Sequence, residues 1–318
     1  MRAGRGTAAL PIGIFLLLAI LPLVATATGG GYLVSLGARI MIFAVAAVAL
    51  DLLLGFGGLI SFGHAAFIGL GAYAVGILAA HGISDALIAL PAALAVSALY
   101  AFLTGIVCLR TKGVYFIMIT LAFGQMVFFT ASSLAPYGGD DGLTIAARNT
   151  LLGFPVIKND RTFYYVVFVC LLGSYLFCRA LVASRFGRVL RGAKENPVRI
   201  ETIGFDVYRF QLAAYVIAGA LGGLSGLLLA NATEYVSPAY MSWQRSGELI
   251  VMVLLGGLGT LNGAIIGTAA YLLTEEWLSA YTESWKVIFG PVLVLVVLFA
   301  RGGLTGLATQ LVRRLGRG

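Results

Sequence analysis

Long apolar runs separated by short polar segments dominate this chain. A helix needs about 20 apolar residues to cross the roughly 30 Å of hydrocarbon in a bilayer, and most of the runs approach that length. The pattern predicts an all-α integral membrane protein, a polytopic bundle of about 8–10 transmembrane helices with Gly-broken or re-entrant segments. The predicted spans lie near 10–27, 33–54, 64–80, 86–109, 113–134, 163–182, 210–230 and 285–300.

Two glycine-rich segments interrupt this pattern. The apolar stretch 247–276 is too long for one span and is cut by GGLGTLNG at 256–263, a cluster that breaks helices. It predicts two half-length helices or a re-entrant hairpin. Residues 57–73 resemble 256–271. Structural repeats with broken helices are common in transporters, but two Gly- and Ala-rich packing helices also look alike by composition, so both interpretations stay open.

Glycines and polar residues in these segments and in the span 113–134 are candidate gating or pore elements, because glycine-broken spans let packed helices change their arrangement. The candidates are Gly57, Gly58, His64, Gln125, Gly256, Gly257 and Asn262. GxxxG patterns at 219–223, 222–226 and 263–267 predict close helix packing, either within the chain or against a partner.

Composition excludes the water-soluble classes of protein. Of the 318 residues, 60% are hydrophobic and 11% are charged, which leaves too little polar surface to cover a soluble globule. The three cysteines lack ligand spacing, so neither a metal site nor a disulfide is expected. No phosphate-binding loop or nucleophile elbow occurs. We therefore expect no enzymatic activity and no cofactor on this chain.

The net charge of +8 indicates membrane orientation rather than nucleic-acid binding. With the N-terminus in the cytoplasm, most lysines and arginines fall on the cytoplasmic side, as the positive-inside rule requires. Both termini are then cytoplasmic. The run 10–27 ends like a signal-peptide cleavage site, but its apolar stretch is longer than usual, so we favour a retained span.

The spans and charges together predict one transmembrane domain covering residues 1–318. Its parts are the first six spans at 8–182, a cytoplasmic coupling loop at 183–209, the remaining spans at 210–300 and a basic cytoplasmic tail at 301–318.

Few ionisable residues lie inside the predicted spans, notably Asp51, His64 and Glu248. Intramembrane charge is costly and first suggests a functional site. However, Asp51 and His64 flank the first glycine turn, and Glu248 begins a helix just after Arg245, where a carboxylate suits the positive helix end. We favour these structural roles over a proton or sodium relay.

The loop 184–210 contains a short capped helix. Asn196 suits the N-cap, Pro197 the first helical position and Gly204 the residue just past the end. A helix of about two turns is too short to be stable alone in water. Its apolar residues Val198 and Ile200, with Ile203, suit a groove on a neighbouring protein. The alternative is a basic loop resting on lipid head groups, which explains the capped helix poorly.

Four blocks, at 58–78, 113–126, 184–230 and 248–267, resemble the permease subunits of bacterial ABC importers for branched-chain amino acids, of the LivM type. The resemblance implies a second, LivH-like permease, two cytoplasmic ATPases that use ATP and Mg, and an external solute-binding protein. It also implies a location in the bacterial cytoplasmic (inner) membrane. Gln211 stands where the family often has lysine, which puts a role for that charge in doubt.

The same resemblance implies that the cytoplasmic loop couples ATP hydrolysis to gating. The coupling residues are then Gly192, Glu195, Asn196, Pro197, Ile200, Ile203 and Gly204. Permeases for urea and short-chain amides are closely similar, and the four blocks do not separate these substrates. Two further hypotheses stay open, an ion-coupled secondary carrier acting alone and a membrane scaffold without transport.

Overall fold

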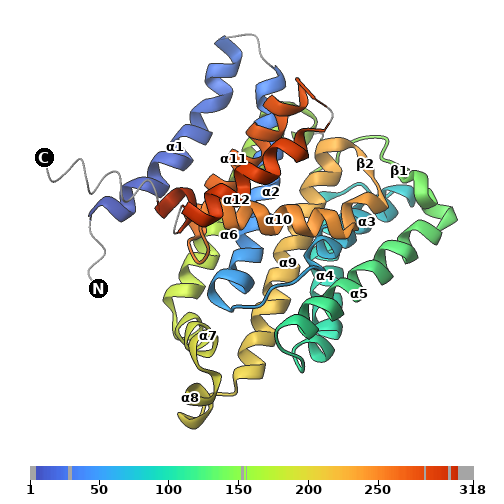
Figure 1. The fold of residues 1–318 in the computed structure, drawn as a ribbon. Coiled ribbons are helices and arrows are strands. Elements are labelled where there is room, and N and C mark those ends of the chain that lie inside the picture. The colour runs from blue at the N-terminus through green and yellow to red at the C-terminus, as the bar shows by residue number, and fades with distance from the viewer. Residues whose placement is uncertain are drawn as a thin grey trace, which may run out of the picture.

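Helices make up most of the structure, a computed structural model that describes residues 5–27, 31–151, 154, 156–282, 284–299 and 302–306. The predicted all-α polytopic architecture is confirmed (Figure 1). A pairing of β1 (Leu143–Thr144) with β2 (Tyr235–Val236) is antiparallel. The α-helices are α1 (Arg5–Ala27), α2 (Gly31–Asp51), α3 (His64–Ala80), α4 (Ala86–Cys108), α5 (Val114–Ser133), α6 (Asp160–Ala183), α7 (Arg185–Glu195), α8 (Pro197–Thr202), α9 (Val207–Thr233), α10 (Trp243–Gly256), α11 (Leu261–Ser279) and α12 (Trp285–Phe299).

Five stretches of the described residues are long and apolar enough to cross a membrane. They are α4, α5, α6, α9 and the combination of α2 with the π-helical turn Leu52–Phe56. A sixth is the pair α10 and α11, which is bent by 115°. Helix α3 and the apolar part of α1, Pro11–Leu23, are shorter. The chain is therefore a multi-pass membrane protein in which some helices cross only part of the bundle.

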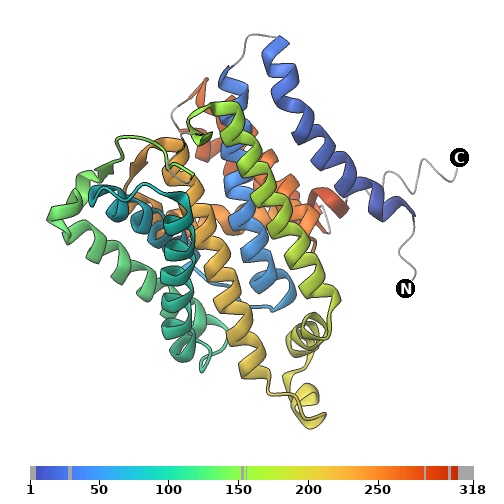
Figure 2. The ribbon, with the colours of Figure 1, turned by 180° about the vertical axis from the view of Figure 1, so that it is seen from behind.

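Helix α2 forms the centre of the bundle. It packs against α1, α6, α9, α10 and α11, and the view from behind shows it between α6 and α9 (Figure 2). No residue from Met41 to Leu53 is more than 3% exposed. Apart from Asp51, this part of the sequence is apolar on every side of the helix, which suits a helix buried in a protein core.

Small residues on α9 let it approach α3 and α4 closely. A methyl group on Gly226 would overlap the carbonyl of Ile68, and one on Gly223 would lie 2.8 Å from the carbonyl oxygen of Ala93. The predicted GxxxG packing at 219–223 and 222–226 is thus confirmed within the chain. In lipid, where apolar burial does not drive association, such close backbone contact is a main source of helix packing energy.

Replacing Gly223 with leucine is expected to lower the yield of folded protein. Its Cβ would lie 2.7 Å from the Cβ of Ser97, and overpacking of a dense core typically costs about 1–3 kcal/mol. The monodisperse peak in detergent size-exclusion chromatography should shrink and its thermal midpoint should fall. Gly173→Leu is the matched control, because nothing lies within 4 Å of a Cβ there. Equal peaks for the two variants would contradict this packing.

Helices α10 and α11 form a re-entrant hairpin. Near the start of α10, the Arg245 guanidinium lies 5.5 Å from the centre of the Phe43 ring on α2. The turn between the helices reaches the far end of α2, where Gly259 contacts Gly55. Near its end, α11 returns to the level of Arg39, which forms an ion pair with Glu275. The predicted helix break at 256–263 is confirmed, and the hairpin enters and leaves at the same end of α2.

The two ends of the bundle carry different features. Helix α6 begins at Asp160 and ends beside α7, so the loop before α6 and the α7–α8 segment lie at opposite ends (Figure 1). Cytoplasmic and external faces were expected for these two loops, and the observed separation is consistent with that expectation. We call the end of the bundle that carries α7 and α8 the α8 end, and the end that carries the loop before α6 the opposite end.

Candidate coupling and gating site

Helix α8 has the start and stop signals that the sequence predicts. The Asn196 side chain accepts a hydrogen bond from the Arg199 backbone N–H (3.1 Å), and Pro197 is the first helical residue. Gly204 has a φ of 94°. Its N–H donates to the carbonyl of Glu201 (2.9 Å), and the Phe205 N–H donates to that of Ile200 (3.2 Å). This pair of bonds is the Schellman C-terminal motif, which glycine favours because its positive φ carries no Cβ penalty.

The apolar residues of α8 face in two directions. Val198 is 65% exposed and Ile203 is 64% exposed. Ile200 instead packs on α7, where its Cδ1 would lie 2.6 Å from a Cβ on Gly192. Ile200 is half-buried and holds α8 against α7, and its contact with a partner protein stays a prediction. The mostly exposed apolar residues of α8 and its flanks are Val198 and Ile203, and Glu195 is also exposed.

Helix α7 joins α8 to the transmembrane core. The Ser184 hydroxyl caps its N-terminus by accepting from the Phe186 N–H (3.1 Å). Val189 and Leu190 are buried, in a helix that packs against α6 and α9. At its C-terminal end, the Lys194 ammonium donates to the carbonyl of Gly55 (2.8 Å) in the π-helical turn after α2. One short helix and one charged hydrogen bond therefore connect α8 to the turn after α2.

Gly57 and Gly58 form the loop that follows the π-helical turn. A Cβ on Gly57 would lie 2.7 Å from the carbonyl oxygen of Leu53. Gly58 has a φ of 69°, and a Cβ there would lie 2.9 Å from the Cγ of Lys194. Because only glycine combines this conformation with such close contact, the loop and the Lys194 side chain fit together.

The two glycine-rich breaks meet at Asp51. This carboxylate is fully buried and accepts a hydrogen bond from the Gly259 N–H (2.8 Å). The backbones of Gly55 and Gly259 are in contact, because a Cβ on Gly55 would lie 2.4 Å from the backbone nitrogen of Gly259. The similarity between 57–73 and 256–271 therefore corresponds to two helix breaks that touch in space. We call Asp51, Gly55, Lys194 and Gly259 the break junction.

Other predicted gating residues surround the break junction. Gly257 has a φ of 115°. The Thr305 hydroxyl donates to the carbonyl of Gly256 (2.8 Å). Asn262, in the first turn of α11, accepts from the Tyr175 hydroxyl of α6 (2.6 Å). These contacts hold both sides of the α10–α11 turn against neighbouring elements, so a rearrangement of the turn must break named hydrogen bonds.

The last two gating candidates lie apart from the junction. His64 begins α3, is fully buried and meets the Phe67 ring edge-on, with 5.4 Å between ring centres. Gln125 is on α5, and its side chain makes no hydrogen bond to another described residue, although the adjacent Gly124 packs on Gly63. The structure therefore brings together the glycines and Asn262 but not His64 or Gln125.

Sequence reasoning did not assign the break junction. The sequence alone places Lys194 among several basic residues of a loop, and it places Asp51 beside a glycine turn. One signal was present: Gly55 and Gly259 each lie in a dense glycine segment, and such segments permit close backbone approach. The acid needed to join them, Asp51, stands one helical turn before Gly55.

A cavity of about 500 Å³ lies beside the α8 end. Its walls include the loop at Gly57 and Gly58, Lys112 before α5, Lys194 of α7 and Gln211 of α9. Gln211, which departs from the lysine common in the resembling family, therefore lines an internal cavity at this end. The lining residues come from both sides of the α8 end, from the start of α5 and from α7 and α8.

Comparison with known proteins agrees with this architecture. Residues 32–298 match the family model described as the branched-chain amino acid transport system / permease component. The chain belongs to this permease family. It is thus a permease subunit of a branched-chain amino acid ABC importer, a system with further subunits. The match extends from α2 to α12 and includes α7–α8 and both helix breaks.

Individual relatives agree with the family assignment. The permease is 26% identical to the high-affinity branched-chain amino acid transport system permease protein LivM of Salmonella typhimurium, over 85% of this chain and 69% of the relative. It is 25% identical to LivM of Escherichia coli K12, over 83% and 68%. It is also 33% identical to the probable permease protein LivH of Methanocaldococcus jannaschii, over 52% and 53%. No solved structure matches the chain.

The intramembrane acid Glu248 is compensated in this permease. Its carboxylate pairs with Arg245 (2.7 Å) on the same helix and with Lys286 (2.9 Å) at the start of α12. A carboxylate held between two cations suits the structural role expected for Glu248. The pairing also ties the α10–α11 hairpin to α12.

Proposed function

We propose that this permease conducts branched-chain amino acids inward across the bacterial cytoplasmic membrane. It would act with a second, LivH-like permease, two cytoplasmic ATPases that use ATP and Mg, and an external solute-binding protein. The observation that carries the proposal is the family match over residues 32–298. On this view the chain is a transport subunit and not an enzyme, and the ATPase chemistry belongs to its partners.

The α8 end faces the cytoplasm in this proposal. Arg185, Arg188, Arg191 and Arg199 all lie in α7 and α8, and basic residues concentrate on the cytoplasmic side of membrane proteins. Both termini are placed on this side as well. The solute-binding protein then meets the opposite end, where the loop between α5 and α6 lies.

Coupling is proposed to pass from α8 to the two helix breaks. The ATPases would receive Val198 and Ile203, and Ile200 would carry their movement to α7. Lys194 then pulls on the π-helical turn after α2, and Asp51 passes the displacement to the α10–α11 turn. Packed helices with a break of this kind switch between discrete arrangements rather than bending continuously. Solute choice rests with the binding protein, and the permease is a conduit whose states are set by the ATPases.

Reconstitution with the partner subunits tests the proposed transport. Proteoliposomes that contain the complete importer and internal ATP are expected to take up leucine when the loaded binding protein is outside. An importer with inactive ATPases is the control and should show only leakage. Uptake of urea or acetamide in place of leucine would contradict the substrate class. Leucine uptake that persists without ATP and collapses with an ion gradient would instead identify an ion-coupled carrier.

A further inference from the structure

A cavity of about 490 Å³ lies at the opposite end of the bundle from α8. Pockets for small molecules usually measure about 300–1,000 Å³ and combine apolar walls with a few polar groups. Here Leu36 and Ile42 of α2 and Leu229 of α9 provide apolar surface, while Arg39 and Glu276 provide opposite charges. The walls come from α2, α6, α9, α10 and α11, so the cavity lies within this one chain.

Two of the three arginines that line the cavity are already paired with carboxylates at hydrogen-bond distance. Arg148 bonds to Asp160 (2.7 Å) and to the carbonyl of Asn231 (3.0 Å). Arg245 bonds to Glu248 at 2.7 Å. Both side chains are thus paired with a carboxylate at hydrogen-bond distance, and these pairs hold the loops and the hairpin in place.

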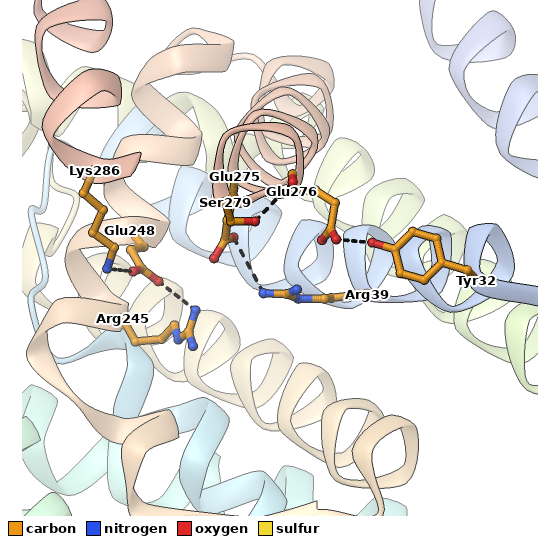
Figure 3. Close-up of polar contacts among 8 residues, drawn as sticks. All are labelled: Tyr32, Arg39, Arg245, Glu248, Glu275, Glu276, Ser279 and Lys286. Atoms are coloured by element: carbon orange, nitrogen blue, oxygen red, sulfur yellow. Dashed lines mark hydrogen bonds and ion pairs between the residues drawn. The ribbon is translucent and has the colours of Figure 1, made fainter. Parts of the chain in front are cut away.

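Arg39 differs from the other two arginines. Its closest described carboxylate atom is Oε2 of Glu275 at 3.6 Å, which is too long for a hydrogen bond. That Oε2 atom is buried and has no hydrogen-bond partner, while the Arg39 side chain is 41% exposed. Figure 3 shows Arg39 between Glu275 and the pair formed by Tyr32 and Glu276. A guanidinium with free donors therefore faces a cavity that also contains a carboxylate.

We propose that this cavity is a transit site for the zwitterionic head group of an α-amino acid. Arg39 binds the carboxylate in the planar two-bond geometry that guanidinium favours, and Glu276 binds the ammonium. The aliphatic side chain lies against Leu36, Ile42 and Leu229. This inference rests on the proposed function and adds to it a substrate-contact site on this chain.

The charge pattern favours a zwitterion over other ligands. A lipid phosphate or another simple anion would meet Arg39 but would also be repelled by Glu275 and Glu276. Urea and short-chain amides carry no charges to match this pair. Charged residues within apolar helices of a membrane protein are costly unless they serve a site or a partner, and the loose Arg39–Glu275 pair is consistent with a cation that a ligand engages.

The charged groups of the cavity partly compensate one another, which suits a conduit. Tyr32 donates its hydroxyl to Glu276, and Arg39 remains within ion-pair distance of Glu275. An entering amino acid exchanges these contacts for its own, so the net gain in free energy is small. Weak binding permits release toward the break junction, whereas tight binding would hold the solute.

Truncated ligands test the site directly. The complete importer without its binding protein, in lipid nanodiscs, is titrated with leucine, isopentylamine and 4-methylpentanoate by saturation-transfer NMR. The intact complex is expected to bind leucine most tightly. Arg39→Gln should weaken leucine binding at least fivefold and leave isopentylamine, which lacks the carboxylate, unchanged. Glu276→Gln should weaken leucine binding and leave 4-methylpentanoate, which lacks the ammonium, unchanged.

Control variants separate recognition from folding. Arg209→Gln removes an arginine at the far end, from an exposed pair with Asp206, and should bind leucine normally. Arg39→Lys keeps the charge but loses the planar geometry. It should weaken leucine binding by several-fold and leave isopentylamine binding unchanged. Equal leucine affinity in Arg39→Gln and the intact complex would overturn the inference. Displacement of leucine by glycerol phosphate would assign the site to a lipid head group instead.

The proposed function and the transit site fail in different ways. If the intact importer takes up leucine with ATP but Arg39→Gln binds leucine normally, the transit site is wrong and the function stands. If the intact importer takes up urea and not leucine, the proposed substrate class itself is wrong.

Discussion

Lys194→Met is expected to uncouple ATP hydrolysis from leucine uptake. The substitution removes the donor to the Gly55 carbonyl, which is 2.8 Å from the lysine ammonium. Hydrogen bonds to charged groups contribute about 1.5–3 kcal/mol, so the contact between α7 and the π-helical turn should weaken by roughly tenfold or more. Uptake in proteoliposomes should fall by a similar factor while the stimulated ATPase rate is retained.

The control for this experiment is Lys112→Met. Lys112 lines the same 500 Å³ cavity but forms no described hydrogen bond to the π-helical turn. It should retain both uptake and ATPase activity. Loss of ATPase stimulation together with uptake in Lys194→Met would place the lysine in assembly rather than in coupling. Normal uptake in Lys194→Met would remove the break junction from the mechanism.

Combined Val198→Asp and Ile203→Asp substitutions are expected to release the ATPases from the permease. Both side chains are mostly exposed in this chain, at 65% and 64%. Burial of one such side chain contributes about 1.5–3 kcal/mol, and a buried carboxylate adds a desolvation cost. The affinity for the ATPases should therefore fall at least about tenfold for each substitution. Co-purification in mild detergent measures the loss.

Matched variants distinguish docking from local folding. Val198→Ile keeps an apolar surface and should retain the ATPases. Ile200→Asp places a charge between α8 and α7, so it should loosen α8 as well. Gly204→Val strains a position with a φ of 94°, which costs about 1 kcal/mol or more. If the double aspartate variant keeps its ATPases and imports at the normal rate, α8 is only a basic membrane-surface segment.

Local sequence signals predicted the coupling helix well because its determinants are close together in the chain. Asn196 and Pro197 start α8, and Gly204 ends it, all within nine consecutive residues. Caps and positive-φ glycines act on the backbone next to them, so their effect does not depend on distant packing. The helix break at 256–263 followed for the same reason.

Contacts between distant segments could not be derived in this way. The Asp51–Gly259 bond joins residues 208 positions apart, and Lys194–Gly55 joins residues 139 apart. Hydropathy indicates that each segment enters the bundle. It does not indicate how far each helix extends along its neighbours or which of its faces they contact. The sequence alone does not determine which side of α8 packs on α7. A helix of two turns with three apolar residues has no single predicted face, and the structure shows that Ile200 packs on α7.

The sequence by itself determined the membrane class, the approximate spans, the two glycine breaks and the capped helix between α7 and α9, because these follow from composition and from interactions over a few residues. Only the tertiary structure decided that the two breaks touch, that Lys194 links them to α7, and that Arg39 faces a cavity beside Glu276. The physical reason is that small residues allow many helix pairings of similar energy in lipid. The mutual fit of all the helices selects one of them.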